Sequence, residues 1–179
     1  MKKSHTFRLT FCAIFAATSA VLSPFTIPIG TVPIGFVHIS IFLAAGLLGK
    51  KWGTLSQVVF VLLGAVGLPI FSGFRGGIGV LLGPTGGFIF GYILCAFVAG
   101  AFMERFGHSA KSISCAIALG WLCTYVPGIL WYMFVLDTQN ILAAVSVCIL
   151  PFLPGDFLKS VLCIVLINRL RPMFKKLAG

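Results

Sequence analysis

The sequence predicts an all-α integral membrane protein, built as a bundle of six transmembrane helices. Of its 179 residues, 59% are hydrophobic and only 9% are charged, whereas charged residues make up about 25% of soluble domains. Predominantly apolar stretches of roughly the 20 residues that a spanning helix needs recur six times. They cover residues 8–24, 34–49, 52–70, 80–103, 112–136 and 154–170. We therefore expect residues 1–179 to form a single membrane domain.

The positions of the charges indicate how the bundle is oriented. A net charge of +10 would suit nucleic-acid binding only if the basic residues formed one patch or stripe. They lie instead before the first stretch, between the second and third, between the fourth and fifth, and after the sixth: Lys2, Lys3, Arg8, Lys50, Lys51, Arg105, Lys111, Arg169, Arg171, Lys175 and Lys176. Around 25–33, 71–79 and 137–153, the connections contain only Arg75 among basic residues. The positive-inside rule therefore predicts cytoplasmic termini. The apolar stretches predict a lipid bilayer around the chain, and the absence of a single basic patch predicts no nucleic-acid partner.

The first stretch imitates a secretory signal. Lys2 and Lys3 precede an apolar run, and small residues follow at 18–20, which is the order of a signal peptide. We expect the segment to be retained, because its removal would leave an odd number of spans and put the termini on opposite sides.

Alanines on the first stretch are spaced for close helix packing. They form the patterns Ala13-x-x-x-Ala17 and Ala16-x-x-x-Ala20, and small residues four apart let another helix approach closely. From the spacing alone, packing inside the bundle is favoured over contact with a partner.

Six cysteines occur singly in apolar segments, without Cys-x-x-Cys spacing or a nearby histidine to complete a metal site. We interpret them as small core residues, and expect no metal site and no disulfide framework: Cys12, Cys95, Cys115, Cys123, Cys148 and Cys163.

Prolines and glycines break the chain between the first two stretches and predict an outer loop: Pro24, Pro28, Gly30, Pro33 and Gly35. The second stretch then carries one polar exception, His38. We interpret it as a core histidine with satisfied ring nitrogens.

The glycine-rich segment 67–87 is a candidate binding loop, because glycine permits positive φ and close approach of backbone to a ligand. It matches neither the phosphate-binding nor the dinucleotide-binding glycine pattern. Arg75 within it suits capture of a carboxylate or phosphate; contact with lipid headgroups is the alternative. Gly83-Pro84 predicts an interrupted first turn in the fourth span, with Thr85 as a candidate to satisfy the freed backbone groups.

A short apolar segment, 139–148, is cut off by Pro151 and Pro154. It fits a helix lying over the outer mouth of the bundle better than a seventh span. Pro154 then suits the first turn of the last helix.

Asp156 and Lys159 are the strongest indication of function. Each costs about 2.5–3.5 kcal/mol at the centre of a membrane helix, while an ion pair at this spacing returns only about 0.2–0.5 kcal/mol. Counting back from Arg169 at 1.5 Å per residue places the pair about 20 Å away, in the outer part of the membrane. With Arg75, it suits a small amphiphile that has an amide- or urea-like head and an acid tail.

Catalytic chemistry has less support in the sequence. No carboxylate pair, Ser/His/Asp set or metal cluster is evident, and Glu104 and Asp137 are predicted on opposite sides of the membrane. We therefore expect no catalytic residue, no metal and no cofactor. An intramembrane lipid-modifying enzyme with Asp156 as acid or base, and a structural membrane adaptor, stay as alternatives.

Three motifs together resemble the biotin-specific substrate-binding subunits, called S components or BioY-like proteins, of bacterial energy-coupling-factor (ECF) transporters. They are Gly67-Leu68-Pro69-Ile70-Phe71-Ser72-Gly73-Phe74-Arg75-Gly76-Gly77, Leu82-Gly83-Pro84-Thr85-Gly86-Gly87-Phe88, and Pro154-Gly155-Asp156-Phe157-Leu158-Lys159. The resemblance spans the whole chain, including the alanine-rich first helix. One departure is Phe74, which occupies a place where these proteins are expected to have glycine or another small residue.

The resemblance implies that biotin is captured near the outer face of the bacterial plasma membrane, as a transported ligand. Asp156 and Lys159 would engage its ureido ring and Arg75 its carboxylate. It also implies that the small face of the first helix, Ala13, Ala17 and with them Ala16 and Ala20, docks a transmembrane coupling subunit, with two cytoplasmic ATPases completing the assembly. An S component for another small vitamin is the alternative within transport.

Overall fold

The computed structural model describes residues 2–27, 34–150 and 152–178. Helices make up nearly all of it: α1 (Lys2–Leu22), α2 (Val37–Ala65), α3 (Ile78–Leu82), α4 (Gly86–Phe106), α5 (Ala110–Val135), α6 (Ile141–Cys148) and α7 (Leu153–Ala178). Two short strands, β1 (Thr26–Ile27) and β2 (Ile34–Gly35), pair antiparallel after α1. The predicted helical class is confirmed, whereas most of the outer loop predicted around Pro28, Gly30 and Pro33 lies outside the described residues.

Helix α2 consists of two arms that turn at Gly49, whose φ of 78° and ψ of −177° are not helical. The arms correspond to the second and third predicted stretches. Glu104 of α4 holds the turn, since its Oε1 accepts a hydrogen bond from the Lys50 amide at 2.9 Å. The second arm ends at Ala65 rather than near residue 70, because Gly67 adopts a φ of 114° that continues no helix.

The predicted interruption at Gly83-Pro84 is confirmed, because α3 ends at Leu82 and α4 begins at Gly86. Thr85 precedes α4 without a side-chain capping bond, so the repair assigned to it is wrong. The Trp131 indole on α5 satisfies a freed backbone group instead, because its Nε1 donates a hydrogen bond to the Gly83 carbonyl at 3.0 Å.

The core lies where α4 packs against both α2 and α5. Phe42, Phe60, Met103 and Ile113 are fully buried there, together with Ile167 of α7. A second, smaller cluster lies under α6, the short helix expected over residues 139–148, and contains Phe88, Tyr132, Ala144, Cys148 and Phe152.

The cysteine interpretation holds for part of the set. The residues Cys12, Cys95, Cys148 and Cys163 are buried, and Cys123 is half-buried. It is wrong for Cys115 of α5, which is exposed. All six thiols are free.

Helix α1 divides its alanines between the two faces. Ala13 and Ala17 are exposed, whereas Ala16 is only 2% exposed and Ala20 packs against the main core. The helix is also tied to both arms of α2 by buried side chains, because Ser19 Oγ lies 2.9 Å from Ser40 Oγ and 3.2 Å from Gln57 Oε1.

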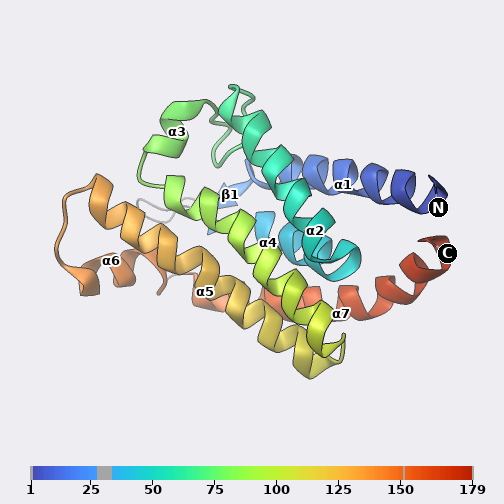
Figure 1. Cartoon of the computed structure of the whole chain (residues 1–179). Helices are drawn as coiled ribbons and strands as arrows, with labels where there is room; N and C mark the ends of the chain where they lie inside the picture. The colour runs from blue at the N-terminus through green and yellow to red at the C-terminus, as the bar shows by residue number, and fades with distance from the viewer. Residues whose placement is uncertain (1, 28–33, 151, 179) are drawn as a thin grey trace.

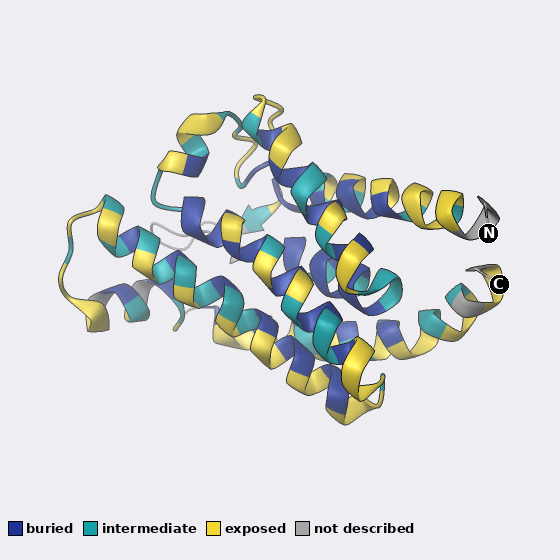
Figure 2. Cartoon of the chain, in the orientation of Figure 1, coloured by how far each residue is buried: buried dark blue, intermediate teal, exposed yellow. Residues whose placement is uncertain are grey.

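Exposed positions recur along the outward faces of the helices in Figure 2. Large apolar side chains are among the exposed residues, and Phe134 of α5 and Leu142 of α6 are 80% and 78% exposed. Three helices within the described residues, covering His5–Leu22, Gly86–Phe106 and Ala110–Val135, are long and apolar enough to cross a membrane. Exposed patches of this extent are unusual on soluble monomers. The fold is that of an all-helical membrane protein.

The two ends of the bundle differ. Figure 1 shows the N- and C-termini together at one end, with α3 and α6 at the opposite end and β1 lying towards them. The candidate site lies at the end formed by α3 and α6.

Candidate functional site

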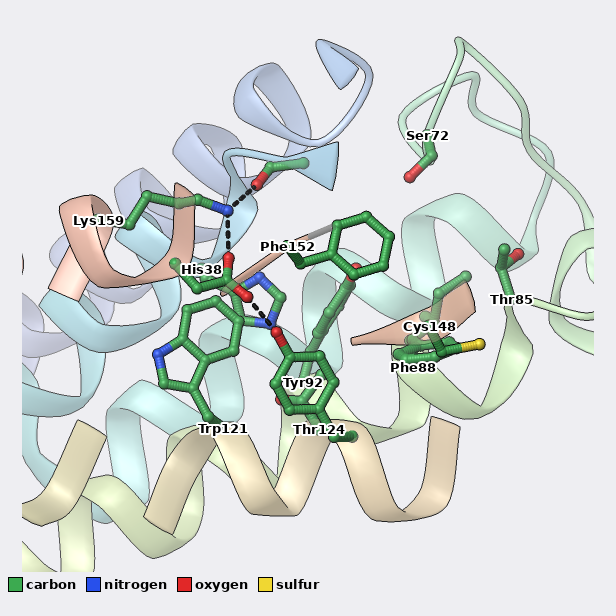
Figure 3. A pocket seen from close by; sticks show the side chains of 14 residues that line it. His38, Ser72, Thr85, Phe88, Tyr92, Trp121, Thr124, Cys148, Phe152 and Lys159 are labelled. Atoms are coloured by element: carbon green, nitrogen blue, oxygen red, sulfur yellow. Dashed lines mark hydrogen bonds and ion pairs between the residues drawn. The ribbon is translucent and has the colours of Figure 1, made fainter. Parts of the chain in front are cut away.

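A cavity opens where the beginnings of α2, α4 and α7 meet the middle of α5. Its lining includes Gly35 of β2, Ser72 of the loop after α2, and Phe152, just before α7. In Figure 3, side chains from separate elements face this space, among them Lys159, His38, Trp121 and Phe88. The cavity combines an apolar wall with one polar end, which is the usual composition of a small-molecule pocket.

Asp156 and Lys159 form the polar end. Both belong to the start of α7, where Pro154 occupies the first turn and the helix N-terminus favours a negative charge. Lys159 Nζ lies 2.6 Å from Asp156 Oδ1, and each side chain is 8% exposed. The structure thus brings together two of the three predicted ligand-binding residues, in a buried and hydrogen-bonded pair.

Neighbouring elements satisfy the rest of the pair. The Tyr125 hydroxyl of α5 donates to Asp156 Oδ2, and Lys159 also donates to the Gly35 carbonyl of β2 at 2.9 Å. An ammonium has three N–H donors, so Lys159 keeps one beyond these two acceptors. Each carboxylate oxygen of Asp156 likewise keeps lone-pair capacity for a ligand N–H.

Aromatic rings build the wall beside the pair. Trp121 and Tyr125, one helical turn apart on α5, stack at a centroid distance of 5.6 Å with their planes 19° apart. The Trp121 indole is fixed by a 3.1 Å hydrogen bond from Nε1 to Ser160 Oγ, and its ring lies 5.6 Å from Lys159 Nζ. Such a wall suits a flat, weakly polar ring next to a charged or strongly polar group.

His38 lies within the same group, against Trp121 at 4.2 Å and edge-on to Tyr92 at 5.1 Å. Within the described part of the chain, its buried Nε2 has no hydrogen-bond partner. The interpretation of His38 as a satisfied core histidine is therefore wrong for this nitrogen. The sequence offered a signal, since His38 is a polar residue in an apolar stretch, but not its place beside Asp156 and Lys159.

Arg75 lies apart from the pair, exposed on the loop between α2 and α3 and outside the set of residues that line the cavity. The loop itself is well anchored, because the Phe71 ring is buried against Phe60 and the Phe71 amide donates to the Arg75 carbonyl at 2.9 Å. Ser72 of this loop does line the cavity. Phe74 has a φ of 58°, a conformation that favours glycine, in line with the small residue expected there.

Metal chemistry has no support in the described ranges 2–27, 34–150 and 152–178, where no group of three or more His, Cys, Asp or Glu side chains could hold a metal ion.

Comparison with known proteins identifies the family. A family model described as the BioY family matches residues 1–176. This chain belongs to the BioY family. Its relatives include the biotin transporter BioY of Thermotoga maritima, which is 40% identical over 168 residues, covering 93% of this chain and 96% of that protein. The biotin transporter BioY of Rhodobacter capsulatus is 34% identical over 166 residues, or 86% and 87% of the two chains.

A solved structure supports the same membership. The chain is similar to the S component for biotin from an ECF-type ABC transporter, with a TM-score of 0.88 and 30% identity over 96% of this chain and 94% of that one. The resemblance that the three motifs indicated is confirmed. BioY relatives are named as transporters and not as enzymes. The comparisons therefore do not support the alternative of an intramembrane lipid-modifying enzyme.

Proposed function

We propose that this chain is the S component that captures biotin at the outer face of the plasma membrane for ATP-driven uptake. The observation that carries the proposal is the buried Asp156–Lys159 pair in an aromatic-walled cavity, in a chain of the BioY family. A ureido ring offers two N–H donors and one carbonyl acceptor. The carboxylate and ammonium of the pair complement both kinds of group.

Arg75 is the proposed partner of the biotin carboxylate. The support is indirect: its loop reaches the cavity through Ser72, and a guanidinium binds a carboxylate with two parallel hydrogen bonds. The acid tail of a ligand whose head lies at Asp156 would leave the cavity towards this loop. Arg75, being exposed, would then contact the tail at the mouth.

Six membrane spans with cytoplasmic termini are the proposed arrangement, with each arm of α2 counted as one span. The clustered basic residues lie in the turns and termini that the positive-inside rule assigns to the cytoplasm. The termini share one end of the bundle in Figure 1, and the Asp156–Lys159 pair lies towards the other. A ligand would then enter from outside.

The exposed face of α1 is the proposed docking surface for a transmembrane coupling subunit, to which two cytoplasmic ATPases supply energy. Ala13 and Ala17 are exposed and four residues apart, so a second helix can approach closely there. Because Ala16 is buried and Ala20 packs on the core, the docking contact centres on Ala13 and Ala17.

Calorimetric titration of the purified chain with biotin and a panel of other vitamins tests the function. Tight binding of biotin and weakening by at least about tenfold in Asp156→Asn, Lys159→Met and Arg75→Gln are expected. Lys111→Gln is the control, because this exposed residue lies at the start of α5. Tight binding of a different vitamin would assign the chain to that ligand, and unchanged biotin affinity in all three variants would remove the site assignment.

A further inference from the structure

The ring of His38 is held firmly within the polar end of the cavity. Its plane lies 31° from that of Trp121 on α5, and it meets Tyr92 on α4 edge-on at 87°. The residue is 8% exposed and sits at the start of α2.

Burying a nitrogen without a hydrogen bond is costly, and in native structures such a group calls for an explanation. In residues 2–27, 34–150 and 152–178, nothing pairs with Nε2 of His38. The cavity that His38 lines together with Asp156 and Lys159 supplies the explanation, if the missing partner is a ligand.

We propose that Nε2 of His38 accepts a hydrogen bond from the ligand's head group and so sets selectivity for an intact ureido ring. This rests on the proposed function. Lys159 keeps one N–H for the ureido carbonyl, and Asp156 can accept from one ureido N–H. The second ureido N–H then needs an acceptor, which a neutral imidazole provides at Nε2 when its proton is on Nδ1. His38 thus completes a three-point match to a cyclic urea.

Two substitutions separate the hydrogen bond from ring packing. His38→Phe keeps an aromatic ring against Trp121 and Tyr92 but removes the acceptor, whereas His38→Gln places an amide near the position of Nε2. In titrations of the purified chain, His38→Phe is expected to weaken biotin about tenfold, the loss that goes with one buried hydrogen bond. His38→Gln is expected to stay within about threefold of the unmodified chain.

Ligand analogues locate the contact. Desthiobiotin retains the ureido ring without the thioether sulfur, so His38→Phe should weaken it by the same factor as biotin. Each ureido nitrogen is then methylated in turn. One of the two mono-N-methyl analogues should bind the unmodified chain weakly and lose nothing further in His38→Phe, because the hydrogen bond is already absent.

The remaining outcomes test the His38 contact and the proposed function separately. Unchanged biotin affinity in His38→Phe overturns the inference, and a loss for biotin but not for desthiobiotin overturns the ureido contact by moving it to sulfur. If the unmodified chain does not bind biotin, the proposed function fails instead. Ligand-free thermal unfolding checks folding; if His38→Phe does not fold, His38→Asn, whose shorter amide cannot reach the Nε2 position, takes its place in the same comparison.

Discussion

Asp156 and Lys159 neutralise each other at the polar end of the cavity, and their contacts explain how two charges persist in a lipid-embedded fold. The carboxylate accepts from both Lys159 and Tyr125, and the ammonium also donates to the Gly35 carbonyl. A buried ion pair stabilises little relative to apolar residues, but removing one partner leaves an unpaired charge that is expensive. The pair is therefore better explained by ligand binding than by stability.

This reasoning predicts non-additive stability at the pair. Lys159→Met should lower the free energy of unfolding by about 3–5 kcal/mol, because it strands the buried Asp156 carboxylate. Adding Asp156→Asn should recover part of that loss, since no charge is left unpaired. Thermal or denaturant unfolding of the detergent-purified chain measures both, with the exposed Lys111→Met as control. A double variant as unstable as the sum of the two single variants would contradict the argument.

The sequence revealed Asp156 and Lys159 because charges are rare and costly in apolar stretches. It did not reveal Trp121, Tyr125 or Tyr92 as cavity residues, because an aromatic side chain in a membrane helix serves core packing equally well. Their role depends on how α4 and α5 face α7, which is a property of the packed bundle.

At the scale of elements, the turn between the two arms of α2 depends on Gly49. Its positive φ disfavours any side chain, and a Cβ there would also overlap the Glu104 carboxylate that holds the Lys50 amide. Gly107 offers a matched position, because its φ of 83° and ψ of −172° nearly equal those of Gly49, and a Cβ there would have no heavy atom within 4 Å.

Gly49→Ala should therefore destabilise the chain more than Gly107→Ala. Both carry the backbone cost of a side chain in a φ/ψ region that is essentially restricted to glycine, about 1–3 kcal/mol, and only Gly49→Ala adds the collision with Glu104. Combining Gly49→Ala with Glu104→Ala should remove the excess, apart from the lost hydrogen bond. Unfolding midpoints of the three variants check this, and equal losses for the two single variants would show that Glu104 yields without cost.

Element boundaries show where sequence reasoning was limited. The break between the second and third stretches was expected at Lys50 and Lys51, and the break at Gly83-Pro84 was expected from glycine and proline chemistry. The end of the second arm of α2 was misplaced by about five residues, since apolar residues continue through Leu68 and Ile70 although Gly67 has already turned the chain. Hydropathy alone does not distinguish helix from a well-packed apolar loop.

At the scale of the whole molecule, the two ends of the bundle carry different polar groups. Basic residues gather at the termini and in the short connections around 49–51 and 105–111, and Figure 1 shows both termini at the end opposite α3 and α6. The cavity with its ion pair is lined from the beginnings of α2, α4 and α7. Apolar side chains cover the outward faces between the two ends. A bundle with this division can hold a polar ligand at one side of a membrane while presenting a helix surface to a partner within it.

The exposed alanines of α1 give the last prediction. Ala13→Leu combined with Ala17→Leu should abolish or strongly reduce co-purification with a coupling subunit expressed alongside, because the added side chains keep the partner helix from close approach. Biotin binding to the isolated variant should be unchanged, since the cavity is lined by other elements. Ala118→Leu is the matched control, an exposed alanine on α5, and should affect neither measurement. Retained co-purification in the α1 variant, or an equal loss with Ala118→Leu, would place the docking surface elsewhere.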